Sequence, residues 1–256
     1  ALAIQKFEEY DLDQSLYVID VRQSLYLKQI FKTLDLLGYD WADKLHHLPY
    51  ELVNLPGNVT MSSREGTVVM LDDLVAEATQ RARTIVEEKN PELSDQAKET
   101  IAEAVALGAL KYTMLSRDNT KVVTFDWDAA LDFNGQAAPY IQYAHVRAGS
   151  ILRKAGDSLP GASDFPAELE KAEVDLIELM TRLPVEVLRS AEEYRPLVIA
   201  NLAYDLARAF NDFYNTCHVL NAEPEVRAYR LRLVAAAQQV IATSLQLLGI
   251  QAPSMM

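Results

Sequence analysis

The sequence predicts a mainly α-helical protein in which a short α/β portion is followed by an antiparallel helical bundle. A strand–helix–strand pattern occupies residues 17–53, and two long helical runs follow it. From Pro139 onward the pattern is entirely helical and is interrupted only by short loops. We therefore expect two domains, residues 1–135 and residues 136–256.

The α/β portion begins with Tyr17–Val21, which is predicted to be a short buried strand. The next segment is predicted to be a helix that ends at Gly38, because apolar residues recur at a three-to-four spacing. These residues are Leu27, Ile30, Phe31, Leu34 and Leu37. His47–Val53 is predicted to be a second strand, and Pro49 places it at a sheet edge. This order is typical of a parallel α/β unit.

One such unit is too small for a complete nucleotide-binding sheet, which needs about five strands. Two interpretations are open: a small mixed domain, or a chain that begins part-way through a larger domain. The start at Ala1 rather than at a methionine favours the second interpretation.

The other elements are predicted from apolar periodicity and capping residues. Thr67–Leu71 and Lys121–Phe125 are strand-like, and the chain is expected to break at Asn134-Gly135. Ser94 and Asp126 are expected to cap helices, since their side chains accept backbone N–H groups. The predicted helices cover about residues 72–89, 94–115, 127–131, 139–154, 165–182, 196–216 and 224–249.

Prolines mark several helix ends in the predicted bundle. Pro139, Pro196 and Pro224 stand near predicted first positions, where the missing N–H of proline is tolerated. Pro184 is expected to stop the helix before it and to leave a short segment that reaches about Ser190.

Composition excludes several classes of protein. No apolar run approaches the roughly 18 residues that a membrane span needs, and the first residues lack the features of a signal peptide. Cys217 is the single cysteine and forms no internal disulfide, which fits a reducing cytoplasm. The four histidines and this cysteine show no metal-ligand spacing, so we expect no metal site.

The net charge of −13 argues against a general nucleic-acid binder, which usually carries a basic face. The charge is uneven, however. Residues 1–135 hold 13 Lys and Arg against 23 Asp and Glu, whereas residues 136–256 hold 11 against 14. A nearly neutral half is compatible with a local basic or aromatic surface for RNA.

The segment Pro56–Gly66 is a polar loop between two strand-like segments. Its backbone N–H groups, the hydroxyls of Ser62 and Ser63, and the Arg64 guanidinium suit the binding of a phosphate. A plain hairpin loop is the alternative interpretation of the same residues.

Four segments carry a resemblance to one family. The string PYIQYAHVR at Pro139–Arg147 matches PYLQYAHAR nearly residue for residue, and Asn201–Tyr214 follows the pattern Y-LA-FN-FY. Tyr17–Phe31 looks like a strand-to-helix segment beside an adenosine pocket, and Thr60–Gly66 resembles the KMSKS-type loop written KMSTRKG. From about residue 10 to residue 256, the chain resembles the arginyl-tRNA synthetases, which are class I aminoacyl-tRNA synthetases.

The resemblance implies the C-terminal half of such an enzyme: the last part of a nucleotide-binding α/β fold, then a helical anticodon-binding domain. It implies ATP-dependent ligation of arginine to tRNA(Arg), with Mg²⁺ accompanying ATP, in a cytoplasmic monomer. The implied catalytic residues are Ser62, Ser63 and Arg64, and the implied ATP-binding residues are Asp20, Gln23, His47 and Met61.

The likeness is weakest around the catalytic pocket. Thr60, Ser63 and Glu65 stand where the family's loop has lysines, Tyr26 replaces a histidine and Glu51 replaces a glycine. The family's HIGH motif and arginine-binding residues precede the matched region. We therefore expect the 256-residue chain alone to be inactive and to hold no cofactor tightly.

In the bundle, the resemblance implies tRNA contacts from aromatic, amide, guanidinium and thioether side chains. These residues are Tyr140, Gln142, Tyr143, Arg147, Tyr204, Asn211, Tyr214, Arg227, Arg230 and Met256. Structural alternatives stand beside this one: the tyrosines are ordinary helix-packing pairs, and the last two arginines pair with Glu223 and Glu225.

Two other functions stay open at the sequence level. One is a non-catalytic tRNA-binding or regulatory paralogue, which the altered loop favours. The other is a helical protein-interaction module with no RNA role, which predicts no salt-sensitive binding of tRNA.

Overall fold

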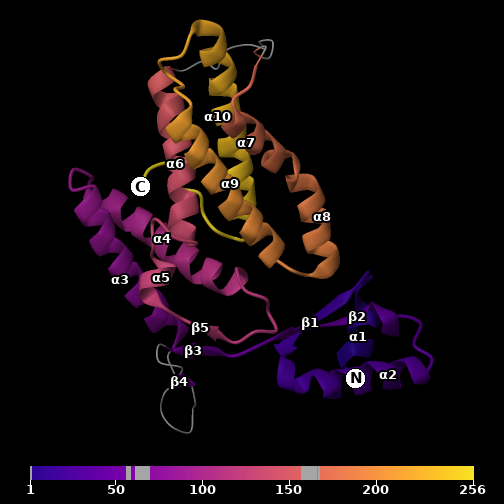
Figure 1. The fold of residues 1–256 in the computed structure, drawn as a ribbon. Helices are drawn as coiled ribbons and strands as arrows, with labels where there is room; N and C mark the ends of the chain where they lie inside the picture. Colours follow the sequence, from indigo (N-terminus) through magenta and orange to yellow (C-terminus); the bar gives the residue numbers. More distant parts are fainter. Residues whose placement is uncertain (1, 56–58, 61–69, 157–165, 167) are drawn as a thin grey trace. The chain divides into compact units, whose positions relative to one another are not determined.

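The computed structural model describes residues 2–55, 59–60, 70–156, 166 and 168–256. Most of these residues are helical, which confirms the mainly α prediction. The chain forms two compact units, one of residues 1–60 and 118–124 and the other of residues 61–117 and 125–256. Figure 1 shows the helices and strands of both units.

The first unit contains a parallel α/β element. β1 (Ser15–Asp20) leads through the 3-10 turn η1 (Val21–Gln23) into α2 (Ser24–Leu36), and β2 (Leu45–Tyr50) lies beside β1. The two strands pair in parallel along their whole length, which confirms the predicted strand–helix–strand order. Pro49 is accommodated because β1 is the only neighbour of β2 among the described strands, and an edge strand needs fewer N–H donors.

An N-terminal helix, α1 (Leu2–Glu9), is absent from the sequence prediction. Its apolar side packs against the small core of the first unit, and Phe7 stacks on Trp41 with ring centroids 4.4 Å apart. That core is formed by Leu34, Ala42 and Leu45. A helix this short is marginal by itself in water, so this docking, which local sequence does not reveal, stabilises it.

A three-stranded sheet completes the first unit. β3 (Val53–Leu55) pairs antiparallel with β4 (Val59–Thr60) and parallel with β5 (Val123–Thr124). The predicted strand at residues 47–53 is therefore divided between β2 and β3. The Glu51 N–H donates to the Asn119 carbonyl at 2.9 Å, where the chain passes from one sheet to the other.

The predicted strand Thr67–Leu71 lies largely outside the described residues, but its last residue is helical. Leu71 begins α3 (Leu71–Lys89), so the strand prediction is wrong at that position. Asp72 and Asp73 lie in the first turn of α3, where carboxylates favour the positive end of the helix dipole.

The second unit begins with a hairpin of α3 and α4 (Asp95–Leu115), which pack against each other. The Ser94 hydroxyl accepts the Ala97 N–H at 3.3 Å, as expected for a cap. The short helix α5 (Trp127–Ala130) is capped in the same way, because the Asp126 carboxylate accepts the Ala129 N–H at 2.9 Å. Both predicted caps are confirmed.

The bundle has its helices in the predicted order, with one helix more than expected. They are α6 (Ala138–Ala155), α7 (Lys171–Thr181), α8 (Leu183–Glu193), α9 (Leu197–Thr216) and α10 (Pro224–Leu247). Pro184 does not merely stop a helix: it lies in the first turn of α8, where no N–H is required of it. The helix expected from residue 165 begins only at Lys171, with Glu170 and Glu173 in a capping box.

The core of the bundle is built around α9, which contacts α6, α7, α8 and α10 (Figure 1). Its inward residues are almost fully buried and include Leu202, Leu206, Phe210 and Phe213. Each such side chain contributes roughly 1.5–3 kcal/mol when it leaves water. The α3–α4 hairpin groups with this bundle by packing, whereas the expected domain boundary at residue 135 stays a prediction.

Candidate functional site

Two of the residues predicted to bind ATP, Asp20 and Gln23, lie at or just after the carboxyl end of β1. The Asp20 carboxylate accepts the Arg22 backbone N–H at 2.8 Å and the Arg22 guanidinium at 2.9 and 2.7 Å. These hydrogen bonds with Arg22 lower the pKa of Asp20 to about 2. Gln23 follows as the N-cap of α2 and makes no capping bond with its side chain. This end of the strand therefore presents an ionised carboxylate and an amide within four residues.

His47 joins the same region from β2. Its Nε2 lies 2.9 Å from the Ile19 carbonyl oxygen. Since a carbonyl only accepts, Nε2 carries the hydrogen, and the imidazole ties the two strands together beside Asp20. The other predicted members of the catalytic site, Met61 and the Ser62–Arg64 segment, lie outside the described residues.

The most distinctive arrangement of the bundle is a cation between two aromatic rings. The Arg147 guanidinium lies 4.8 Å from the ring centroid of Tyr143 and 4.7 Å from that of Tyr214. Its Nη1 also donates to the Asn211 side-chain oxygen at 2.5 Å. We call these four residues the arginine stack. All four are among the residues predicted to contact tRNA.

Helix geometry explains why these four side chains meet. Tyr143 and Arg147 are four residues apart on α6, and Asn211 and Tyr214 are three apart on α9, so each pair lies on one helix face. The two helices pack against each other and bring the faces together. Both tyrosines keep solvent access, with 39% of Tyr143 and 43% of Tyr214 exposed. The stack is thus preorganised and still open to a ligand.

Two hollows border the stack. One, of about 420 Å³, is lined by Val86, Lys89, Asn90, Phe133, Asn134, Tyr143, Arg147 and Met256. The other, of about 380 Å³, is lined by Arg147, Ser150, Ile151, Lys154, Tyr214, Asn215, Cys217, His218, Val219, Leu220 and Asn221. Arg147 lines both. A hollow that combines aromatic faces, amides and a cation suits an unstacked base with its phosphate.

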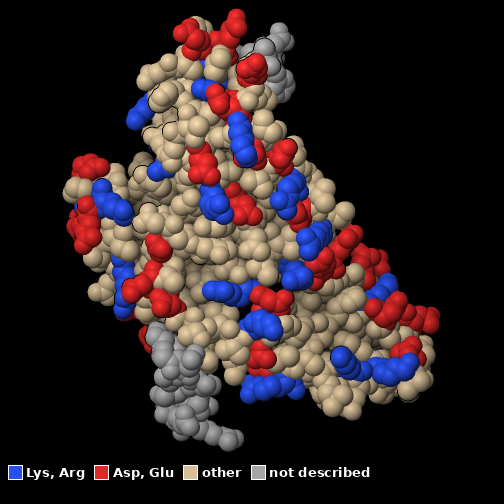
Figure 2. All heavy atoms as spheres, viewed as in Figure 1, with Lys and Arg blue, Asp and Glu red and all other residues tan. Residues whose placement is uncertain are grey.

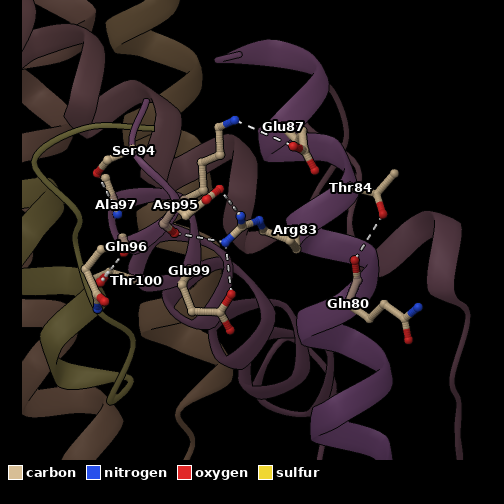
Figure 3. A network of polar contacts seen from close by, with 11 residues as sticks. Gln80, Arg83, Thr84, Glu87, Ser94, Asp95, Gln96, Ala97, Glu99 and Thr100 are labelled. Atoms are coloured by element: carbon tan, nitrogen blue, oxygen red, sulfur yellow. Dashed lines mark hydrogen bonds and ion pairs between the residues drawn. The ribbon is translucent and has the colours of Figure 1, made fainter. Parts of the chain in front are cut away.

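The α3–α4 hairpin supplies one wall of the first hollow. Figure 3 shows the polar contacts that lock this hairpin: Arg83 on α3 binds Asp95 at 2.9 Å and Glu99 at 3.0 Å on α4. The network lies one to two turns before Lys89, whose ammonium sits 5.1 Å from the centroid of the Phe133 ring. Lys89, Phe133 and the Lys154 of the second hollow are contributions that the sequence analysis did not single out, because no local pattern joins them.

Tyr140 and Tyr204 form a separate pair of half-buried rings, with centroids 5.5 Å apart. They pack α6 against α9, which fits the structural alternative given for the tyrosines. Arg208 lies 6.0 Å from the Tyr204 ring centroid. Neither tyrosine lines the two hollows beside the arginine stack.

Three other predicted RNA contacts have different surroundings in the structure. Gln142 is fully buried, and its Nε2 donates to the carbonyls of Ala104 at 3.1 Å and Gln251 at 2.8 Å. Direct contact of Gln142 with RNA is therefore not available in this structure, because the amide faces protein on all sides. The prediction overlooked that a polar side chain on the inner face of α6 has backbone carbonyls to bind.

Arg230 is likewise engaged inside the protein. Its Nε donates to Glu173 at 2.7 Å and its Nη1 to the His218 carbonyl at 2.9 Å, and only 2% of the Glu173 side chain is exposed. The partner is thus a buried carboxylate on α7, and not the carboxylates at the start of α10 that the sequence suggested. The neighbouring Arg227 is half-buried and donates to the Ala155 carbonyl at 3.4 Å.

The surface charge is mixed rather than uniformly basic. On the face shown in Figure 2, the described Lys and Arg side chains are interspersed with Asp and Glu. Across the described residues, no helix is long and apolar enough to cross a membrane. Within the same residues, no group of three or more His, Cys, Asp or Glu side chains is arranged to hold a metal ion.

Comparison with protein families assigns both portions of the chain. The family model described as "tRNA synthetases class I (R), catalytic domain" matches residues 1–127. The model described as "DALR anticodon binding domain" matches residues 141–256. The fold and these matches together point to the class I aminoacyl-tRNA synthetases. One portion of the chain matches their catalytic domain, and the other matches an anticodon-binding domain.

Similar proteins narrow the class. The chain is 38% identical to the arginine–tRNA ligase of Clostridium botulinum (strain 657 / Type Ba4), over 98% of this chain and 44% of that protein. It is 39% identical to the arginine–tRNA ligase of Ligilactobacillus salivarius, over 100% of this chain and 45% of that protein. The chain belongs to the arginyl-tRNA synthetase family.

Solved structures agree with this assignment. The Thermus thermophilus arginyl-tRNA synthetase superposes with a TM-score of 0.87 at 42% identity, over 95% of this chain and 41% of that one. The Plasmodium falciparum arginyl-tRNA synthetase shares the fold with a TM-score of 0.76 at 21% identity, over 94% of this chain and 41% of that one. The chain thus spans between 41% and 45% of the length of these four proteins.

Proposed function

We propose that residues 136–256, together with the part of the first hollow that comes from residues 86–134, bind the anticodon region of tRNA(Arg) through the arginine stack and its two hollows. The observation that carries this proposal is the Arg147 guanidinium held between Tyr143 and Tyr214, both still exposed. The family assignment of residues 141–256 as a DALR anticodon binding domain supports it. The tRNA contacts expected for Asn211 and Met256 belong to the same proposal.

The physical basis is stacking combined with a local cation. A base that stacks on an exposed tyrosine gains on the order of 1–3 kcal/mol, whatever the net charge of the protein. Arg147 uses one donor on Asn211 and has further N–H groups to offer to a phosphate or a base edge. Lys89 and Lys154 add positive charge on either side of the stack. A chain of net charge −13 can therefore bind RNA at this one surface.

Titration of a fluorescent tRNA(Arg) transcript, read by anisotropy, tests the proposal. Tyr214→Ala should weaken binding roughly tenfold through the loss of a stacking face. Tyr10→Ala is the matched control, since Tyr10 is 61% exposed and belongs to the other unit. Equal affinity of the Tyr214 and Tyr10 variants, or no loss of affinity as salt is raised, would favour a protein-interaction module instead.

We further propose that residues 1–127, which include the first unit, contribute to arginine activation in a longer polypeptide. The ATP-side residues would be Asp20, Gln23, His47 and Met61, with Ser62, Ser63 and Arg64 acting on the triphosphate. Several large apolar side chains of this unit are exposed, which supports a continuation of the fold over them. They are Leu16, Val18, Leu25, Tyr26 and Tyr50, between 46% and 68% exposed.

A non-catalytic tRNA-binding paralogue is the second candidate function. The observation that favours it is the loss of lysine at Thr60, Ser63 and Glu65 in the KMSKS-type loop. The nucleotide sequence upstream of the codon for Ala1 discriminates between the two. An open frame that encodes HIGH supports the enzyme, which we propose is a cytoplasmic monomer that uses MgATP, whereas an in-frame stop codon supports the paralogue.

A further inference from the structure

The segment after α10 makes hydrogen bonds to α6 through its backbone carbonyl groups. It runs along α4 and α6 (Figure 1) and presents carbonyl oxygens to α6. Gln142 donates to the Gln251 carbonyl at 2.8 Å, and the His145 Nδ1 lies 3.0 Å from the Pro253 carbonyl. Farther along α6, the Arg153 Nη1 donates to the Ser254 carbonyl at 3.2 Å. We call residues 250–256 the tail.

The donors form one row on one face of α6. Gln142, His145 and Arg153 are separated by three and eight residues, which returns to the same side of a helix after each interval. Gln142 is fully buried and His145 is 8% exposed, so the tail covers them. Because the Pro253 carbonyl can only accept, the His145 Nδ1 must carry the hydrogen of this contact. One helix therefore donates to three carbonyls of the tail, those of Gln251, Pro253 and Ser254.

The same helix carries half of the arginine stack. Tyr143 and Arg147 alternate along α6 with the tail-holding residues Gln142 and His145, and the tail ends with Met256 in the hollow that Tyr143 and Arg147 line. One helix thus carries half of the arginine stack and also holds the tail whose last residue lines the same hollow. Such shared support is what a binding site needs if its walls are to keep a fixed separation.

We propose that Gln142 and His145 are positioning residues that hold the tail so that Met256 forms one wall of the base-binding hollow. The proposal rests on the proposed tRNA-binding function and deepens it. It gives Gln142 a role in RNA binding that needs no contact with RNA. It also assigns the His145 imidazole a single task, donation of Nδ1–H to a backbone carbonyl.

A plainer alternative is that the tail only covers apolar surface. Pro253 and Ile250 are buried, and their burial alone stabilises the fold. Under this alternative, loss of one of the hydrogen bonds between α6 and the tail lowers the free energy of unfolding and has no specific effect on the hollow. The two hypotheses predict different positions of the Met256 side chain when His145 is replaced. They also predict different effects on tRNA affinity when substitutions at His145 and Met256 are combined.

The first measurement observes the tail without RNA. With methionine labelled by ¹³C at its methyl group, the Met256 signal is assigned by its disappearance in Met256→Leu. In the unchanged chain, the Phe133 and Tyr143 rings that line the hollow should displace this signal. His145→Leu should return it towards the position of an unrestrained methionine, and His145→Asn, whose amide can also donate, should restore it. An unmoved signal in His145→Leu would overturn the proposal.

The second measurement combines substitutions in tRNA titrations. We expect His145→Leu and Met256→Ala each to weaken binding of a tRNA(Arg) transcript about tenfold, and the double variant to be no weaker than either alone. Independent effects that multiply to about a hundredfold would contradict the proposal, since a purely structural His145 does not act through Met256. If His145→Leu fails to fold, Arg153→Ala replaces it, because Arg153 donates to the Ser254 carbonyl at an exposed position. The Met256 signal and the tRNA affinity are then measured in that variant.

The two proposals fail in different ways. If the unchanged chain does not bind tRNA, the proposed function is lost, while the labelled methyl still reports whether His145 positions Met256. If tRNA binds and the Met256 signal is unchanged in His145→Leu, the proposed tRNA-binding function is retained and the positioning role of His145 is wrong.

Discussion

At the scale of single residues, the arginine stack depends on the shape of a side chain and not only on its charge. A guanidinium is planar, so it lies between the Tyr143 and Tyr214 rings and still donates to Asn211. An ammonium is a compact, strongly hydrated charge that offers no such plane. The resemblance pointed to each of these residues separately, whereas the structure joins them into one unit.

Arg147→Lys separates charge from shape. We expect the substitution to weaken tRNA(Arg) binding about tenfold, since one stacked and hydrogen-bonded group is lost, while the salt dependence of binding stays the same. Anisotropy titrations at two salt concentrations measure both quantities. Arg208→Lys is the control, because Arg208 lies 6.0 Å from the Tyr204 ring centroid and lines neither hollow. A full-affinity Arg147→Lys would show that charge alone matters.

The buried His145 imidazole makes stability depend on pH. Burial lowers its pKa below the usual 6.5, and the hydrogen bond to the Pro253 carbonyl opposes this only in part. Above pH 6.5 the side chain is neutral in both states. Below that pH the unfolded chain binds a proton that the folded chain resists, so the free energy of unfolding should fall as the pH drops. Urea unfolding between pH 7.5 and 5 measures the slope, and His145→Asn should reduce it.

At the scale of elements, α4, α6 and the tail meet closely at Gly108. A Cβ built there would lie 3.0 Å from the Gln142 Nε2 and 3.2 Å from a methyl of Ile250. Gln142 has little freedom to withdraw, because its amide donates to two backbone carbonyls. The absent side chain thus permits the approach of the tail to both helices.

Gly108→Ala tests this close approach through the sign of its effect. In an open helix the change would stabilise by roughly 0.5–1 kcal/mol, but here we expect a loss of about 1–3 kcal/mol from overpacking. Urea unfolding gives the difference in free energy. Glu103→Ala, at an exposed position of α4, should change it by less than about 0.5 kcal/mol. A stabilised Gly108→Ala chain would mean that Gln142 yields easily.

Helices were predictable wherever capping chemistry and apolar spacing agreed. Ser94 and Asp126 cap the expected helices through their side chains. α8 was missed because a proline such as Pro184 can either end the preceding helix or lie in the first turn of the next one. Only the packing of α8 on α9 decides between these two positions. The short α1 was missed because its stability comes from docking on Trp41 and its neighbours, which are distant in sequence.

At the scale of the whole molecule, the described residues of the first unit do not form a nucleotide-binding sheet of full size. β1 and β2 form a two-stranded sheet within the described residues, whereas such folds need about five strands. The relatives that the chain matches are more than twice as long as the matched region. Chemistry that requires a complete pocket is therefore expected of a longer polypeptide.

ATP–pyrophosphate exchange measures whether the 256-residue chain activates arginine. With arginine and tRNA(Arg) present, we expect the 256-residue chain to give no turnover above a blank without protein, because positioning of the reacting groups supplies much of the rate. Binding of tRNA by the same sample serves as the control for correct folding. Turnover well above the blank would show that these residues suffice for activation.

The sequence by itself determined the mainly helical fold, the parallel strand–helix–strand unit and the family, because periodicity, caps and strings such as Pro139–Arg147 are local properties. Only the tertiary structure decided which predicted contacts are surface and which are core. Tyr143 and Gln142 are neighbours on α6, yet one faces a hollow and the other is buried against two carbonyls. One residue of helix turns a side chain by about 100°, and what lies in that direction depends on segments more than 30 residues away.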